Sequence, residues 1–232
     1  MGVDNISIEP VPTDEEIGFI LTNAAKYLSK RPSRSDILSV YAGLRPLVKV
    51  GDAKSTSALS RDHTILISNS GLLTIAGGKW TTYRRMAQDA VEQAQIMAGL
   101  EERPCTTEHL QIHGWTRQSI PEPNLRVYGA DAPAIQELAR KEPALAEKLH
   151  SELPYTGAEV VWAVHQEMAR TVEDVLARRT RALLLGARAS IEAAPRVAEL
   201  MARELKRGED WQEQTVRNFK EVAQGYLPPA SA

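Results

Sequence analysis

The stretch LLTIAGGKWTTYR, residues 72–84, indicates more about the fold of this chain than any other segment. Its first residues are apolar or β-branched and predict a short buried strand. Two consecutive glycines predict a tight turn. The residues after Lys79 predict a helix, so the segment as a whole is expected to form a strand, a turn and a helix.

The same turn is a candidate binding site. Gly77 and Gly78 have no Cβ atom, so a ligand can approach the backbone closely. The following helix offers unpaired N–H groups and a partial positive charge, with Thr81 or Thr82 as its cap. Together with Lys79, these features suit a phosphate or the carbonyl edge of a reduced flavin. An ordinary strand–turn–helix is the alternative, because short glycine motifs occur often.

The flanking sequence predicts a small sheet with a long helix. Residues 64–68 and 72–75 alternate in polarity around Asn69-Ser70-Gly71, which predicts a hairpin. Residues 37–50 are interrupted only by Gly43 and Pro46 and predict a strand that enters a loop. Residues 80–98 form an amphipathic pattern that predicts one long helix.

The pattern changes after residue 100. Residues 101–122 contain two prolines and little periodicity, and they predict a linker. From residue 123 onward strand signals almost vanish and helical blocks follow one another. We therefore expect an α+β fold in which residues 1–100 form a small mixed or antiparallel sheet with a long helix, and residues 123–232 an all-α domain. The helices predicted there are 131–141, 143–151, 157–169, 171–187, 189–206 and 210–224.

Helix signals also occur near the start of the chain. Thr13 and Glu16 have the spacing of a capping box, and apolar residues at helical spacing follow to about residue 29.

Composition limits the classes of function. The chain has 232 residues, of which 43% are hydrophobic and 25% charged, with a net charge of −2. This balance gives no reason to expect a nucleic-acid partner. Cys105 is the only cysteine, which excludes an internal disulfide and favours a reducing compartment. No long apolar run and no signal peptide is found, so we expect a cytoplasmic protein. The histidines share no metal-ligand spacing, and no metal is expected.

Three cations accompany the candidate turn. Arg45 lies between apolar neighbours in VYAGLRPLV (40–48), Arg61 precedes Asp62 in SRDH (60–63), and Lys79 follows the glycines. On neighbouring strands they would suit a small dianion, with Arg as a bidentate partner and Lys as a point charge. The alternatives are that Arg45 extends to water and that Arg61 and Asp62 form a solvated turn pair.

These motifs resemble the flavin-dependent glycerol-3-phosphate dehydrogenases. VYAGLRPLV, SRDH and GLLTIAGGKWTTYRRMAQDAVEQA (71–94) carry the resemblance, in the same order and spacing. The opening segment 3–28 and two tail segments, VEDVLARRTRALLLGARAS (172–190) and APRVAELMARELKR (194–207), also resemble the family. The family's N-terminal flavin-binding half, with its dinucleotide fingerprint, has no counterpart here, so the resemblance implies a C-terminal portion.

The resemblance also implies roles for residues. Arg45 and Lys79 would be catalytic residues that hold substrate before the flavin, with Arg61 as a further phosphate-binding residue. Gly77, Gly78, Lys79 and Thr81 would bind FAD, in a site that this chain leaves incomplete. The implied reaction converts glycerol 3-phosphate to dihydroxyacetone phosphate, passes hydride to FAD and delivers electrons to quinone. Alone, the chain is expected to be inactive and to self-associate or to pair with an N-terminal half.

The helical tail leaves two further functions open. Between residues 178 and 207 it has an excess of arginine and lysine. A solvated, salt-bridged face is the ordinary explanation. The alternatives are a basic surface for the inner membrane face or nucleic acid, or a non-catalytic module that binds phosphate or protein.

Overall fold

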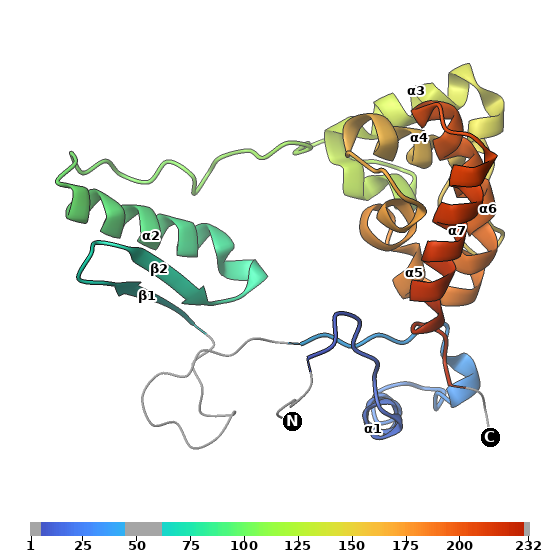
Figure 1. Cartoon of the computed structure of the whole chain (residues 1–232), viewed down its shortest axis with the longest axis horizontal. Coiled ribbons are helices and arrows are strands. Elements are labelled where there is room, and N and C mark those ends of the chain that lie inside the picture. Colours follow the sequence, from blue (N-terminus) through green and yellow to red (C-terminus); the bar gives the residue numbers. More distant parts are fainter. Residues whose placement is uncertain (1–5, 45–61, 230–232) are drawn as a thin grey trace. The chain divides into compact units, whose positions relative to one another are not determined.

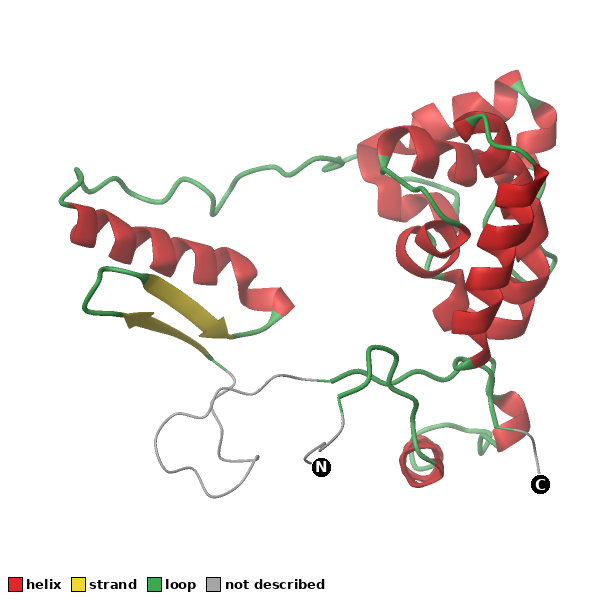
Figure 2. Cartoon of the chain, viewed as in Figure 1, coloured by secondary structure: helices red, strands yellow, loops and turns green. Residues whose placement is uncertain are grey.

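The computed structural model describes residues 6–44 and 62–229, and these fall into two compact units. The hairpin unit comprises the described part of 44–112, and the helical unit comprises 6–43 together with 113–229. Figure 1 labels their helices and strands, and Figure 2 shows that strands are confined to the hairpin unit within the described chain. The predicted α+β class with a helical C-terminal domain is confirmed.

The hairpin unit has the predicted strand–turn–helix order. Strands β1 (His63–Ile67) and β2 (Leu73–Gly77) pair antiparallel, with His63 opposite Gly77 and Ile65 opposite Ile75. A 3₁₀ turn, η3 (Trp80–Thr82), leads into α2 (Tyr83–Ala98), which ends at Gly99 in the left-handed conformation. The predicted hairpin and long helix are both present.

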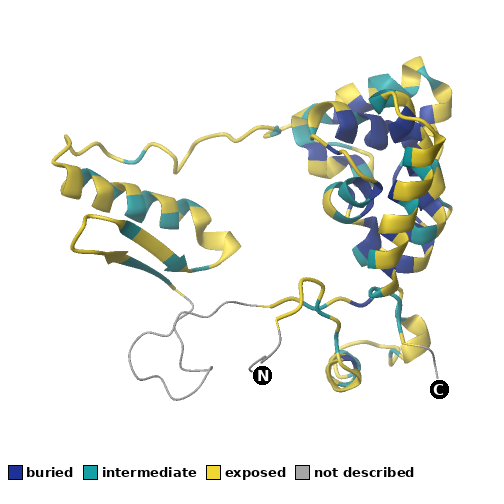
Figure 3. Cartoon of the chain, viewed as in Figure 1, coloured by how far each residue is buried: buried dark blue, intermediate teal, exposed yellow. Residues whose placement is uncertain are grey.

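The described part of the hairpin unit has almost no core. None of its described residues is fully buried, whereas several large apolar side chains such as Leu66, Leu72 and Ile96 are more than half exposed. Figure 3 shows this contrast with the helical unit, which contains the buried residues. A two-stranded sheet with one helix buries too little apolar surface to be stable by itself.

The helical unit contains the hydrophobic core. It is built from α3 (Ala132–Lys141), α4 (Gly157–Gln166), α5 (Ala182–Leu185), α6 (Ala187–Leu205) and α7 (Glu209–Gln224). Apolar residues of this unit form one cluster that includes Ile135, Val160, Leu176, Met201 and Phe219. The unit also contains shorter helical segments: η1 (Arg34–Asp36), η4 (Pro123–Asp131), η5 (Pro143–Ala146) and the π-helix η6 (Asp174–Arg179).

Two predicted helices of this unit differ from the structure. The block 143–151 forms only η5, because the backbone then turns to make the bridge between Lys148 and Thr156. The block 171–187 is split into η6 and α5 at Arg181, which has a left-handed φ of 59°. Local helical spacing could not reveal the first break, because the bridge pairs Lys148 with a residue further along the chain.

The first part of the chain groups with the helical unit. Helix α1 (Asp14–Ala24) begins at the predicted capping box, where the Glu16 amide donates to Thr13 Oγ1 at 3.2 Å, but it ends before residue 29. The predicted strand from residue 37 is wrong over residues 37–44, which form no strand. Residues 38–40 instead contact the helical unit, so 6–43 belongs with that unit and not with the hairpin.

Residues 38–40 act as a strap across the ends of three helical segments. The Val40 amide donates to the Tyr226 carbonyl at 2.9 Å, and the Ala187 amide at the start of α6 donates to the Leu38 carbonyl at 3.1 Å. The Ser39 hydroxyl donates to the Leu183 carbonyl at 2.8 Å. These bonds satisfy backbone groups that helix ends leave unpaired.

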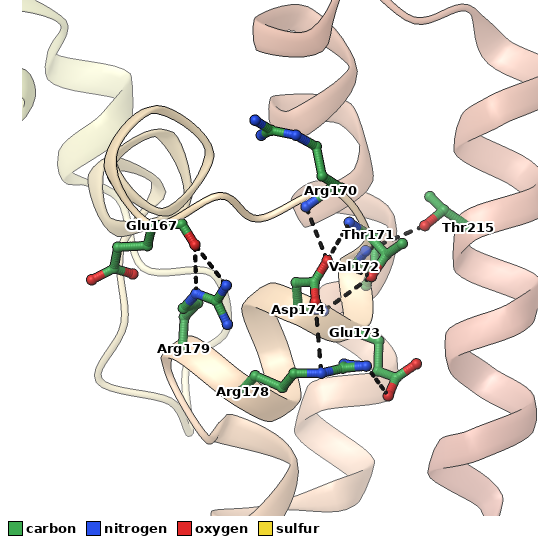
Figure 4. Close-up of polar contacts among 9 residues, drawn as sticks. All are labelled: Glu167, Arg170, Thr171, Val172, Glu173, Asp174, Arg178, Arg179 and Thr215. Atoms are coloured by element: carbon green, nitrogen blue, oxygen red, sulfur yellow. Dashed lines mark hydrogen bonds and ion pairs between the residues drawn. The ribbon is translucent and has the colours of Figure 1, made fainter. Parts of the chain in front are cut away.

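A polar cluster fixes the π-helix between α4 and α7 (Figure 4). Asp174 Oδ2 accepts from the amides of Arg170 and Thr171 and from the Thr171 hydroxyl, each at 3.0 Å. The Val172 amide donates to Thr215 Oγ1 of α7 at 3.2 Å, and the Arg179 guanidinium donates to the Glu167 carbonyl at 2.6 and 2.9 Å. The segment 172–190 thus has a structural role in the helical unit.

We expect Ser39→Ala to destabilise the helical unit by about 1 kcal/mol, because a half-buried hydroxyl then no longer donates to Leu183. Urea unfolding followed by circular dichroism measures the change. Ser35→Ala, at an exposed serine next to the strap, is the control. Equal stability of Ser39→Ala and the unsubstituted chain would show that the strap does not stabilise this unit.

Asp174 should make the helical unit sensitive to acid. Burial alone would raise the pKa of Asp174, but the hydrogen bonds from Arg170 and Thr171 outweigh burial and hold this pKa below its ordinary value of 3.8. A lowered folded-state pKa stabilises the fold above the unfolded value, and this contribution is lost as the pH falls through the folded value.

The difference in unfolding free energy between the unsubstituted chain and Asp174→Asn should therefore be constant above about pH 5 and shrink below about pH 4. Urea unfolding at several pH values measures it, with the exposed Asp210→Asn as control. A difference that stays constant down to about pH 2 would contradict this origin of acid sensitivity.

Candidate functional site

Two successive left-handed glycines form the turn at the end of β2. Gly77 has φ 78° and Gly78 has φ 82°, values that residues with a side chain rarely adopt. Lys79 is extended, with φ −139° and ψ 153°. Its amide donates to Thr82 Oγ1 at 3.2 Å, and the Thr82 hydroxyl donates to the Lys79 carbonyl at 3.0 Å. Of the two threonines proposed as caps, Thr82 therefore stabilises the turn.

The turn presents donors and a cation to solvent. Gly77, Lys79 and Thr81 are exposed. Within the described chain, the amides of Trp80 and Thr81 donate to no protein acceptor, and the Lys79 ammonium forms no ion pair. The first N–H groups of a helix have no partner within the helix, which explains why Trp80 and Thr81 are free. This arrangement can bind an anionic or electron-rich group.

Gly78 also has a packing role. A Cβ atom there would lie 2.4 Å from Met86 Sδ and 3.4 Å from His63 Cβ. Met86 of α2 therefore occupies the space next to Gly78, and close approach of a ligand is not needed to explain this glycine. Gly77 is exposed, so it is the glycine beside which a ligand has room.

The other two predicted cations are not placed. Arg45 and Arg61 lie outside the described residues, and the structure neither brings them to Lys79 nor separates them from it. The expectation of three cations on neighbouring strands stays a prediction.

A histidine–carboxylate network lies beside the turn. His63 Nε2 is 2.9 Å from Asp89 Oδ2, and Arg85 Nε is 2.9 Å from Asp89 Oδ1. His63 and Asp89 line a hollow of about 400 Å³ between β1 and α2, together with Ile65, Ile67, Glu92 and Gln93. The i,i+4 spacing of Arg85 and Asp89 was the available signal for part of this network.

An exposed aromatic pair also lies at the start of α2. The rings of Trp80 and Tyr83 stack with centroids 5.4 Å apart, and Trp80 is 85% exposed. The residues are three apart on a helical turn, which brings their side chains together. Sequence analysis identified neither residue as part of a site.

The residues present fit one edge of a flavin. Gly77 leaves the backbone open, Lys79 supplies positive charge, and the free N–H groups of Trp80 and Thr81 favour an electron-rich carbonyl edge. They do not form a dinucleotide-binding site, because the described chain contains no βαβ unit.

Three arginines in the basic run of the helical unit form ion pairs. Arg178 pairs with Glu173, Arg196 with Glu199, and Arg203 with Glu142 and Glu204. This supports the ordinary explanation, a salt-bridged helical face.

Neither a metal-binding cluster nor a membrane-spanning helix occurs in the described residues. Among residues 6–44 and 62–229, no group of three or more His, Cys, Asp or Glu side chains is arranged to hold a metal ion. No helix in this described part is both long and apolar enough to cross a membrane.

Comparisons with known proteins point to one family. Residues 71–215 match the family described as the C-terminal domain of alpha-glycerophosphate oxidase. Mitochondrial glycerol-3-phosphate dehydrogenases of Mesocricetus auratus and Homo sapiens are 38% and 36% identical, over 94% and 96% of this chain. A solved structure, the glycerol-3-phosphate dehydrogenase from Bacillus halodurans complexed with FAD, matches 99% of this chain at 25% identity with a TM-score of 0.73.

The match covers only part of each relative. The chain spans 32% and 34% of the two mitochondrial proteins and 48% of the Bacillus halodurans chain. The family match includes the motif of residues 71–94, and the match to the solved structure spans nearly the whole chain. The chain belongs to the family of the C-terminal domain of alpha-glycerophosphate oxidase, and it corresponds to a C-terminal portion of FAD-dependent glycerol-3-phosphate dehydrogenases.

Proposed function

We propose that this chain supplies the substrate-binding cations and the helical part of a flavin-dependent glycerol-3-phosphate dehydrogenase. The observation that carries the proposal is the Gly77–Thr81 turn, which combines an exposed ammonium with open backbone and free N–H groups. The proposed reaction oxidises glycerol 3-phosphate to dihydroxyacetone phosphate. FAD, when bound, accepts the hydride from C2 of the substrate, and quinone is the proposed final acceptor.

The residues of this chain have distinct roles in the proposal. Lys79 places a mobile positive charge beside the turn, where it holds the substrate dianion and orients it. Arg45 and Arg61 are proposed as its bidentate phosphate partners. Gly77, Gly78 and Thr81 present backbone to the pyrimidine edge of the flavin, where the start of the helix stabilises negative charge.

The proposal includes an incomplete flavin site. FAD contacts beyond one edge must come from polypeptide outside this turn, so the chain alone should bind substrate weakly and show no turnover. The exposed strand edges and apolar side chains of the hairpin unit support association with an N-terminal half or with a second copy. A cytoplasmic location with peripheral contact to the inner membrane face, close to a quinone pool, belongs to the same proposal.

Lys79→Ala should abolish saturable binding of glycerol 3-phosphate, because the exposed ammonium is the described cation of the site. Binding to the unsubstituted chain should be weak, on the order of millimolar, which isothermal titration calorimetry at high protein concentration detects. Lys79→Arg should retain part of the affinity, since it keeps the charge but changes its geometry.

Lys141→Ala is the matched control, since Lys141 is an exposed lysine of the helical unit that pairs with Glu137. Unchanged affinity in Lys79→Ala would contradict the proposed function.

Gly77→Ala should weaken FAD binding more than Gly99→Ala does, although both substitutions should lower the stability of the fold. Alanine at a left-handed position costs about 1–2 kcal/mol of folding free energy, and at Gly77 its methyl group would also obstruct the open side of the turn. Gly99→Ala is a matched control, because Gly99 has φ 62° with open space around it but lies at the other end of α2. Flavin fluorescence titration measures affinity and thermal unfolding measures stability. Equal loss of FAD affinity in both variants would exclude flavin contact at Gly77.

A further inference from the structure

The contact between His63 of the hairpin and Asp89 of α2 lies directly beside the candidate turn. His63 is the first residue of β1 and pairs with Gly77, the last residue of β2. From its position opposite the turn, its imidazole extends to Asp89 on the second turn of α2, 2.9 Å away. His63 on the strand side and Met86 on the helix side therefore enclose Gly78, the residue that precedes Lys79.

The Asp89 carboxylate contacts two side chains, His63 and Arg85. Its Oδ2 contacts His63 and its Oδ1 contacts Arg85, both at 2.9 Å. The side chains of His63 and Asp89 are 19% and 25% exposed, whereas that of Arg85 is 60% exposed. The histidine contact is thus the more sheltered of the two and the one that joins separate elements.

Polar contacts matter more in this unit than in the helical one. In a domain with a packed core, the angle between a helix and a sheet is fixed by interdigitated apolar side chains. Here no described residue of the hairpin unit is fully buried, and residues of β1 and α2 together line a hollow of about 400 Å³. Apolar packing alone therefore constrains the hairpin and the helix weakly.

Lys79 lies at the junction between the hairpin and α2, which a change in the angle between them would disturb. It connects the end of β2, through Gly78, to η3 and α2. A change in the angle between hairpin and helix would redirect its ammonium and the free N–H groups of Trp80 and Thr81. We propose that His63 and Asp89 form a positioning pair that fixes this angle and thereby aims Lys79 at the substrate anion, an inference that rests on the proposed function.

The test uses the full chain and two measurements. Native-state hydrogen exchange by NMR reports on the Lys79 amide, which is hydrogen-bonded to Thr82 Oγ1. Calorimetric titration with glycerol 3-phosphate reports on the site. The variants are His63→Ala, Asp89→Ala and the double variant, and Glu92→Ala is the matched control because Glu92 lines the same hollow from α2.

Asp89→Ala and His63→Ala should each speed exchange at Lys79 and weaken glycerol 3-phosphate binding about three- to five-fold, as expected for loss of a partly exposed hydrogen bond to a carboxylate. The double variant should weaken binding no more than Asp89→Ala, because Asp89→Ala already removes the contact with His63. His63→Gln, whose amide nitrogen can replace Nε2 as a donor to Asp89, should restore most of the affinity. Glu92→Ala should change neither measurement.

Three results would overturn the positioning role. The first is unchanged hydrogen exchange at Lys79 in Asp89→Ala. The second is a loss of glycerol 3-phosphate affinity in the double variant that equals the product of the losses in His63→Ala and Asp89→Ala. The third is a loss of affinity in Glu92→Ala as large as that in Asp89→Ala. If Asp89→Ala unfolds the hairpin unit, Asp89→Asn preserves the side-chain volume and is judged by the same exchange measurement.

Lys79→Ala separates this inference from the proposed function. Loss of binding in Lys79→Ala with normal exchange and binding in Asp89→Ala rejects only the positioning pair. Unchanged binding in Lys79→Ala, or no binding by the unsubstituted chain, rejects the proposed function, while hydrogen exchange still decides whether His63 and Asp89 hold the turn.

Discussion

The left-handed backbone at Gly77 and Gly78 is the constraint on which the candidate site depends. Their φ values of 78° and 82° turn the chain from β2 into η3 and place Lys79 at the junction. A side chain at either position would be strained, and at Gly78 it would also meet Met86. The fold of the hairpin unit and the exposure of the cation therefore follow from the same two residues.

The two units differ in what stabilises them. Apolar helix faces around residues such as Val160 and Met201 give the helical unit a continuous core, which the strap of residues 38–40 and the Asp174 cluster complete with hydrogen bonds. The described part of the hairpin unit has no comparable core, and several of its large apolar side chains are exposed. A unit that carries binding groups but little buried surface depends on polar contacts such as His63–Asp89 and on polypeptide packed against it.

Elements with strong local signals were predictable from sequence. The Thr13 capping box, the hairpin around Asn69-Ser70-Gly71 and the helix after Lys79 are each set by residues close in the chain. The segment 37–44 was not predictable, because its conformation depends on carbonyl and amide partners at Leu183, Ala187 and Tyr226. The turn at Lys79 is likewise set by neighbouring residues and was predicted. The contact between His63 and Asp89 joins residues 26 apart and was not predicted.

Chemical-shift mapping of the whole chain, with FAD and glycerol 3-phosphate added in turn, tests the central claim most directly. The account predicts saturable changes in the ¹H–¹⁵N signals of Gly77 to Thr82, with helical-unit signals such as those of α3 and α6 unmoved. Saturable changes confined to the helical unit, or no saturable change with either ligand, would contradict the assignment of this turn as the place where substrate and flavin meet.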